Sequence, residues 1–178
     1  MGVLAAEPLW IVLRLLHIVS GALWVGSAFL FVAFIGPSAA EVGPSAGPLL
    51  SVVVKKRRAA KIITWLGMIT VAAGWVLWFL NLRSHGGLAD WVGSSFGLGI
   101  TIGAVLATIT FFVGAFGVGR NVERMVDLGD TIAAAGAPPT AEQQAEIARL
   151  QAALEKHGKL DLVLLLLAVS AMATARYW

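Results

Sequence analysis

The chain has 178 residues, of which 58% are hydrophobic and only 13% are charged, and its formal net charge is +3. A soluble domain has roughly 25% charged residues, so this composition indicates a helical membrane protein and excludes a large soluble domain. The chain has no cysteine, which excludes disulfides, thiolate metal sites and cysteine nucleophiles, and no basic-aromatic patch indicates a nucleic-acid partner.

Four long apolar stretches predict four membrane spans, at about residues 9–35, 62–82, 91–119 and 160–177. Each reaches the roughly 20 residues that a helix needs to cross a bilayer. We therefore expect a single all-α domain over residues 1–178, an integral membrane four-helix bundle. The stretch before the first span carries Glu7, no basic residue and no cleavage site, so we expect this span to be retained rather than removed as a signal peptide.

The segments between the spans carry local signals. Gly36-Pro37 is a helix-ending pair, so it predicts the end of the first helix and a loop over residues 38–48. Residues 120–130 predict a polar helical extension of span three, which residues 134–139 break. Thr140 and Gln143 fit a capping box, which predicts a helix over about residues 140–157 that continues into span four.

The basic residues are distributed unequally between the two sides of the predicted spans. Ten of the thirteen lie in the segments after spans one and three, and only Arg14, Arg83 and Arg176 lie on the other side. By the positive-inside rule, segments 36–61 and 120–159 are expected to be cytoplasmic and both termini to lie outside, in a bacterial inner membrane. The expected partners are the lipid bilayer and a larger membrane complex or further copies of this chain.

Span three is rich in glycine and contains two small-xxx-small pairs, Gly93 with Gly97 and Gly99 with Gly103. Such pairs favour close helix packing inside a bundle, and they also give the clearance that a ligand groove needs. Both readings stay open at this point.

His17 is the most informative residue, because a titratable ring inside an apolar span costs free energy unless it is paired or bound. It lies three residues deeper than Arg14 and on the same helix face, about 4.5 Å at 1.5 Å per residue. On span four, Met172 lies four residues inward from Arg176, about 6 Å by the same rise. His17 and Met172 are therefore predicted to reach a similar depth near the outer face.

This layer contains the types of side chain that a b-type haem site needs. The imidazole of His17 and the thioether of Met172 are the candidate axial ligands of the iron. Arg14 and Arg176 are the candidate partners of the haem propionates. Trp78 and Ser94 are predicted to lie in the same layer.

Each of these residues has a simpler explanation. His17 could only bond a neighbouring helix, for instance through Ser20, Ser94 or Thr70. Met172 could be plain packing, and the two arginines could only anchor helix ends. His157 is predicted to lie a membrane thickness from His17, so the two should not share one iron. A second, inner site formed by His157, Asp161, Lys61 and Trp65 is conceivable, although an interfacial ion-pair cluster is the more usual arrangement.

The stretch 16–26, in which His17 is followed by small and apolar residues and then by Trp24-Val25-Gly26, resembles the first helix of a broad group of small bacterial membrane proteins. The group includes the copper-resistance D family, the HemJ-type protoporphyrinogen oxidases and the membrane domain of certain urate oxidases. The end of the chain, residues 157–178, is similar to the last helix of uncharacterised members. In HemJ-like and urate-oxidase-like members this histidine is associated with haem or redox chemistry, which the resemblance implies for His17.

The sequence therefore leaves three candidate functions. The first is a membrane protein that binds b-type haem and acts in electron transfer or in a small-molecule redox step. The second is a non-catalytic accessory or structural subunit of a larger respiratory or photosynthetic membrane complex. The third is copper or small-solute transport, with copper as the alternative metal at His17 and Met172. No hydrolase or phosphate-loop motif is present, and whether the protein is an enzyme stays open.

Overall fold

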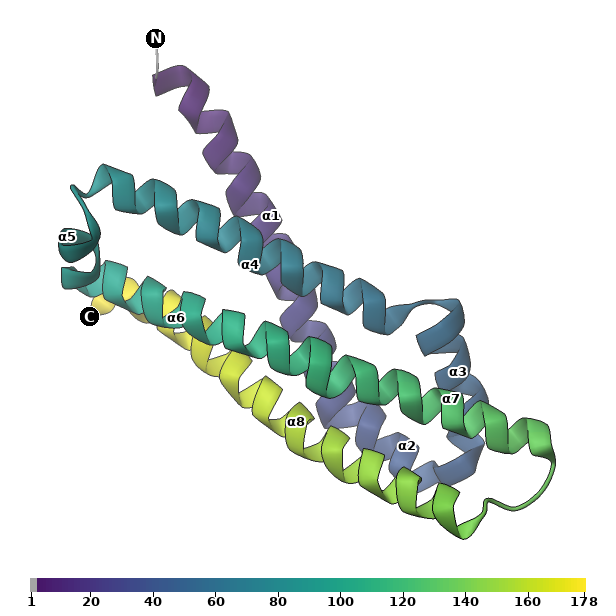
Figure 1. The fold of residues 1–178 in the computed structure, drawn as a ribbon. Helices are drawn as coiled ribbons and strands as arrows, with labels where there is room; N and C mark the ends of the chain where they lie inside the picture. Colours follow the sequence, from purple (N-terminus) through teal and green to yellow (C-terminus); the bar gives the residue numbers. More distant parts are fainter. Residues whose placement is uncertain (1–2) are drawn as a thin grey trace. The chain divides into compact units, whose positions relative to one another are not determined.

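The computed structural model describes residues 3–178, and their side chains from Pro8 onward. Over this range the chain is helical and contains no strand. Four helical stretches are long and apolar enough to cross a membrane, namely Pro8–Lys56, Ala59–Ser84, Ser95–Ala135 and Ala141–Tyr177 (Figure 1). The prediction of an all-α protein is confirmed for the described residues, and so is the prediction of four helices long and apolar enough to cross a membrane. The prediction that the first span is retained depends on the first residues of the chain. Residues 1–2 and the side chain of Glu7 lie outside the part that the structure describes.

The first span does not end at Gly36-Pro37, so that prediction is wrong. Helix α1 (Val3–Leu30) passes through a π-helical turn, η1 (Phe31–Ile35), directly into α2 (Gly36–Val42). Proline normally breaks a helix because it lacks an N–H and clashes with the carbonyl four residues earlier. Here the Gly36 N–H bonds the carbonyl of Phe31, five residues back. The wider π turn relieves the clash, and Pro37 falls in the first turn of α2.

The predicted loop over residues 38–48 is also mostly helical. The chain turns at Gly43, with φ of 67°, and continues as η2 (Gly43–Ala46), α3 (Gly47–Ser51) and the π-helical η3 (Val52–Lys56). Pro44 and Pro48 each stand in the first turn of a short helix, where a missing N–H costs nothing. The prolines that predicted a loop therefore start helices instead.

Span three begins later than predicted, because the chain breaks at Ser94. Helix α4 (Ala59–Ser84) is followed by the short α5 (Leu88–Gly93), and α6 (Ser95–Phe112) starts only after the break. Ser94 has an extended backbone, and its hydroxyl accepts the Gly97 N–H at 3.0 Å. This is the bond of a helix-capping serine, and it places Trp91 on a separate helix from α6.

The segments after span three follow the sequence prediction. The π-helical η4 (Val113–Gly119) leads into α7 (Arg120–Ala135), which ends at Gly136 in the left-handed conformation. The capping box is formed, because the Thr140 N–H bonds the Gln143 side chain at 2.9 Å and the Gln143 N–H bonds the Thr140 hydroxyl at 3.2 Å. Helix α8 (Ala141–Thr174) then runs without interruption and ends in η5 (Ala175–Tyr177).

The residues divide into two compact units. The first unit contains Met1–Val25, Trp65–Phe111 and Val163–Trp178, and the second contains Gly26–Thr64 and Phe112–Leu162. In the first unit the glycines of α6 allow close contact with α8 and η5, since a Cβ at Gly99 would lie 2.7 Å from the Cβ of Ala175 in η5 and 3.4 Å from the carbonyl oxygen of Ala171 in α8. The close-packing role predicted for glycines of span three is confirmed at Gly99 and at Gly103, where a Cβ would lie 2.5 Å from Cγ of Met172.

In the second unit, η3 is joined to α7 by charge. The Lys55 ammonium lies 2.7 Å from a carboxylate oxygen of Asp127 and 2.6 Å from one of Asp130. Ser51 also donates to Asp130 at 3.1 Å. The cationic end of the first helical stretch is thus held against α7.

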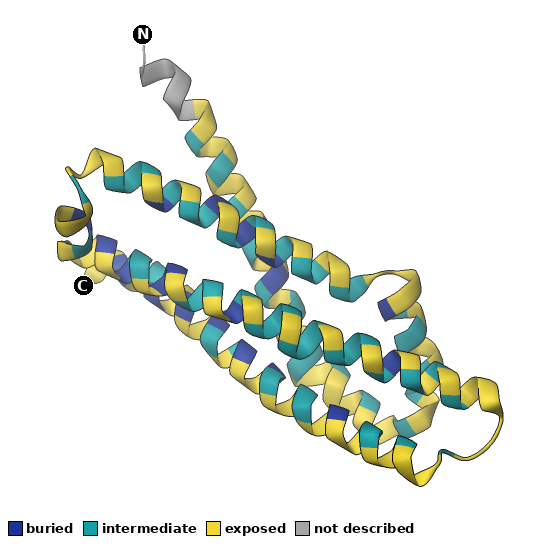
Figure 2. Ribbon diagram, viewed as in Figure 1, coloured by how far each residue is buried: buried dark blue, intermediate teal, exposed yellow. Residues whose placement is uncertain are grey.

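Large apolar side chains remain exposed along the spanning helices, as Figure 2 shows by the exposed positions on α1, α4 and α8. Ile18 is 63% exposed, and residues such as Leu23, Phe79 and Leu166 are exposed as well. A helix that is apolar on its outer as well as its inner face matches a lipid environment.

Candidate functional site

His17 bridges α1 and α4 in the first unit. Its Nδ1 atom lies 2.8 Å from the backbone carbonyl oxygen of Thr70. A carbonyl oxygen only accepts, so Nδ1 carries the hydrogen and the neutral ring keeps its lone pair on Nε2. The hypothesis that His17 bonds a neighbouring helix is confirmed for Thr70, through its backbone rather than its hydroxyl.

Gly74 and a pair of hydroxyl side chains make this contact possible. A Cβ at Gly74 would lie 2.8 Å from Cε1 and 3.0 Å from Nδ1 of His17, so only glycine leaves room for the ring. One turn away, the hydroxyls of Ser20 and Thr70 lie 2.7 Å apart, and both residues are buried. The imidazole is therefore held in one orientation by the Thr70 carbonyl, by the bare backbone of Gly74 and by the contact between the Ser20 and Thr70 hydroxyls, which joins the two helices.

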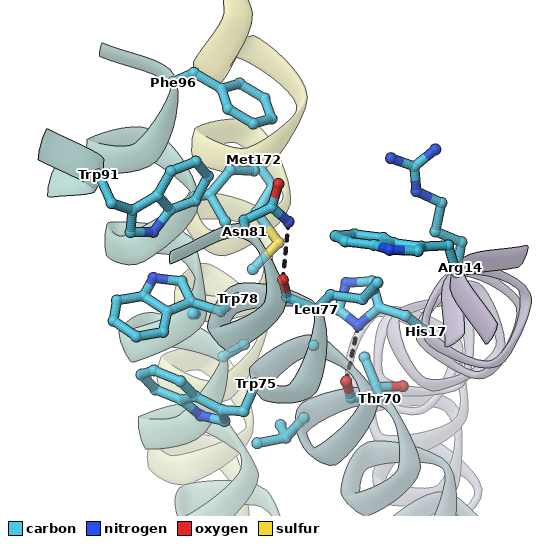
Figure 3. A pocket seen from close by; sticks show the side chains of 16 residues that line it. Arg14, His17, Thr70, Trp75, Leu77, Trp78, Asn81, Trp91, Phe96 and Met172 are labelled. Atoms are coloured by element: carbon cyan, nitrogen blue, oxygen red, sulfur yellow. Dashed lines mark hydrogen bonds between the residues drawn. The ribbon is translucent and has the colours of Figure 1, made fainter. Parts of the chain in front are cut away.

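His17 lines a cavity of about 220 Å³ within the first unit (Figure 3). Its walls come from α1, α4, α5, α6 and α8 and are mostly apolar. The aromatic walls are Trp10, Trp75, Trp78, Trp91 and Phe96. The polar side chains on the lining are Arg14, His17, Thr70 and Asn81. An apolar cavity with a few convergent polar groups is the usual form of a small-molecule site.

Two tryptophans of the wall are fixed by hydrogen bonds to α6. Trp78 Nε1 donates to the Thr101 hydroxyl at 2.8 Å, and Trp75 Nε1 donates to the Thr108 hydroxyl at 3.0 Å. The two rings meet edge to face with centroids 5.4 Å apart. With their N–H groups satisfied, these rings contribute apolar surface to the cavity. Trp78 was predicted from the sequence to lie in this layer and Trp75 was not, although the two are spaced to lie on one helix face.

Trp91 is different, because its N–H lacks a partner. The side chain is 0% exposed, yet Nε1 has no hydrogen-bond acceptor among the residues that the structure describes. Its ring lies 4.8 Å, between centroids, from the ring of His85. Buried donors without an acceptor are rare in folded proteins, so this N–H is an unusual feature beside the cavity.

Arg14 stands on the cavity lining one turn from His17, and its guanidinium lies over the Trp10 ring at 5.6 Å from the centroid. It makes no ion pair with any side chain in the described part of the chain. Its positive charge is thus available to an anionic group at the cavity.

Met172 reaches the same cavity from α8, where its Cγ and Cε pack over the bare backbone of Gly103. Of the six predicted site residues, four line the cavity: Arg14, His17, Trp78 and Met172. Arg176 and Ser94 do not line it; Arg176 is exposed in η5, and Ser94 caps α6. The ligand-binding roles of all six stay predictions.

Bare metal ions need several protein ligands, and the side chains that the structure describes, from Pro8 onward, include no group of three or more histidine, cysteine or acidic residues that could hold one. Comparison of the chain with protein-family models, curated proteins and solved structures finds no match. The cavity around His17 is therefore the basis for a functional proposal.

Proposed function

We propose that this protein binds b-type haem in the cavity around His17 and uses it in electron transfer or in a small-molecule redox step. The observation that carries the proposal is the hydrogen bond from His17 Nδ1 to the Thr70 carbonyl, at 2.8 Å. Histidines that ligate metals almost always donate their other ring hydrogen to a carbonyl, a carboxylate or water, which fixes the tautomer. His17 has this arrangement, with Nε2 free for an axial bond.

The donor set of the cavity suits a haem better than a bare metal ion. A porphyrin brings its own four nitrogens to the iron, so one or two protein ligands suffice. His17 would supply the first, and the thioether of Met172 the second. When bound, haem supplies one-electron redox chemistry, and the protein tunes it through the axial ligands and the polarity of the cavity.

The remaining lining supports the periphery of such a group. Trp75 and Trp78 would cover its apolar faces. Arg14 is exposed at the cavity and would pair with a propionate. Because about 220 Å³ is below the roughly 300–1,000 Å³ typical of ligand pockets, the macrocycle would keep one edge at the exposed mouth beside Arg14. Arg176, which does not line the cavity, is not needed.

The membrane sidedness is part of the same proposal. The distribution of basic residues supports cytoplasmic segments at 36–61 and 120–159 in a bacterial inner membrane, with both termini outside. Arg14 lies at the start of the first span on this assignment, so the haem edge would face the outer leaflet. Electron donors or acceptors would then approach from that side.

A second candidate function is a structural or accessory subunit of a larger membrane complex, or of a homo-oligomer. One observation favours it, because the hydrogen bond between His17 and Thr70 by itself gives the histidine a role in joining α1 to α4. In that case Arg14, which is exposed, would pair with a partner chain or with lipid. Copper or solute transport has no comparable support, since no cluster of metal-binding side chains is found among those that the structure describes.

The test is the visible absorption spectrum of the protein purified in detergent from its native membrane. The haem proposal requires a Soret band that shifts on reduction with dithionite. A protein that is folded and monodisperse but shows no Soret band would contradict it and favour the structural role.

A further inference from the structure

A second polar cluster lies in the second unit, apart from the cavity around His17. His157 and Asp161 stand one turn apart on α8, so they project from the same helix face. Asp161 is only 5% exposed, and its Oδ1 atom is buried without a hydrogen-bond partner among the described residues. The Nδ1 atom of His157 is buried and without a partner in the same part of the chain.

The two side chains pack against bare backbone. A Cβ at Gly114 would lie 3.0 Å from Oδ1 of Asp161, and a Cβ at Gly117 would lie 3.0 Å from Cγ of His157. Both glycines belong to η4, a π-helical segment, and such segments occur frequently at functional sites. Glycine here lets an acid and an imidazole enter a space that other residues would fill.

No cation compensates the buried carboxyl. The segments that contact this face of α8, η4 through its glycines and η1 through Val32 at Gly158, carry no charged residue. On α8 itself, Lys159 pairs with Glu155 at 2.6 Å on the exposed side, and Lys156 is exposed. Lys61 of α4 is exposed, and Arg120 lies over the Phe116 ring at 4.7 Å. The predicted interfacial ion-pair cluster is therefore not formed by Asp161.

An unpaired carboxylate in apolar surroundings is unstable, whereas a carboxylic acid is tolerated. The imidazole of His157 stands one helical turn from the acid and is half-buried, with its Nδ1 atom buried. A ring with two nitrogens can take up a proton at one and release it from the other. The cluster thus has an acid that holds a proton and a neighbour able to relay it.

We propose that His157 and Asp161 form a proton-binding site, in which Asp161 holds one exchangeable proton and His157 carries it between the acid and solvent. The site is independent of the haem proposal, because it shares no residue with the cavity.

The first experiment uses the wild-type protein in detergent. Dicyclohexylcarbodiimide adds to protonated carboxyls in apolar surroundings and leaves a stable acylurea that mass spectrometry locates. We expect labelling at Asp161 at neutral pH, falling about tenfold per pH unit once the carboxyl ionises. Absence of labelling at neutral pH, or suppression by Na⁺ at constant pH, would overturn the proposal, the latter because it identifies a metal-cation site.

The second experiment follows proton exchange by infrared spectroscopy. The wild type should show a protonated-carboxyl band that Asp161→Asn removes and that shifts on transfer to D₂O. His157→Gln should slow that shift, while the matched control Glu155→Gln, at an exposed carboxylate, should leave both band and rate unchanged. An exchange rate that is the same in His157→Gln and the wild type would overturn the relay.

Discussion

Nδ1 of His17 on α1 lies 2.8 Å from the backbone carbonyl oxygen of Thr70 on α4. This contact fixes the tautomer of the ring and leaves Nε2 for a ligand. It also ties two spanning helices together without any charged group.

Gly74→Ala tests whether the ring position depends on a bare backbone. The new methyl would lie 2.8 Å from Cε1 of His17, so the ring must shift or the helices must separate. We expect a loss of about 1–3 kcal/mol in the free energy of unfolding, together with a weakened Soret band. The measurement is unfolding in mixed detergent, followed by the absorption spectrum.

Gly26→Ala is the matched control, because nothing lies within 4 Å of a Cβ there. Equal behaviour of the two alanine variants would show that the close approach of Gly74 and His17 is not important.

Met172→Leu tests the second axial ligand. Leucine conserves most of the packing over Gly103 but removes the sulfur, and thioether ligation raises the reduction potential of haem iron. We expect haem to be retained and its midpoint potential to fall in a spectroelectrochemical titration. Met68→Leu, at a residue outside the cavity lining, is the control. An unchanged potential in Met172→Leu would remove this residue from the ligand set.

Thr101→Val tests how the tryptophan wall is held. It leaves the Nε1–H of the buried Trp78 without an acceptor, which costs about 1–3 kcal/mol of stability. Thr108→Val removes the corresponding acceptor of Trp75, which is only half-buried, so its cost should be smaller. If the unfolding curves of the two variants coincide, the burial of Trp78 does not decide the stability cost of losing the acceptor.

The proposed sidedness can be tested with single cysteines, since the natural chain has none. Ser38→Cys and Ser84→Cys both place a thiol at an exposed position. In intact cells a membrane-impermeant maleimide should label Ser84→Cys, and it should label Ser38→Cys only after lysis. The opposite pattern would invert the orientation.

Much of the helical organisation was predictable from local patterns. The Thr140 capping box and the continuous helix into span four follow from side-chain chemistry near the backbone, and the structure contains both. The passage of the first span through Gly36-Pro37 was not predictable, because it depends on a π turn that residue type alone does not specify. The break at Ser94 was missed for a similar reason, since a serine between apolar residues does not stop a span by itself.

The candidate site was predictable only in part. The depths of residues along the predicted spans indicated one common layer, and four of its predicted site residues line the cavity: Arg14, His17, Trp78 and Met172. The partner of the imidazole is a backbone carbonyl, which every residue carries, so no sequence pattern could identify Thr70 as the acceptor. Gly74 was the available signal, because a glycine on the facing helix is what admits the ring.

The most direct test of the central claim is the reduced-minus-oxidised absorption spectrum of His17→Ala beside the wild type, both purified from the native membrane. The haem proposal predicts a haem signal in the wild type that is lost in His17→Ala. The signal should be kept in His85→Ala, where an exposed loop histidine is removed. A wild type without a haem signal, or a His17→Ala protein with an undiminished one, would contradict it.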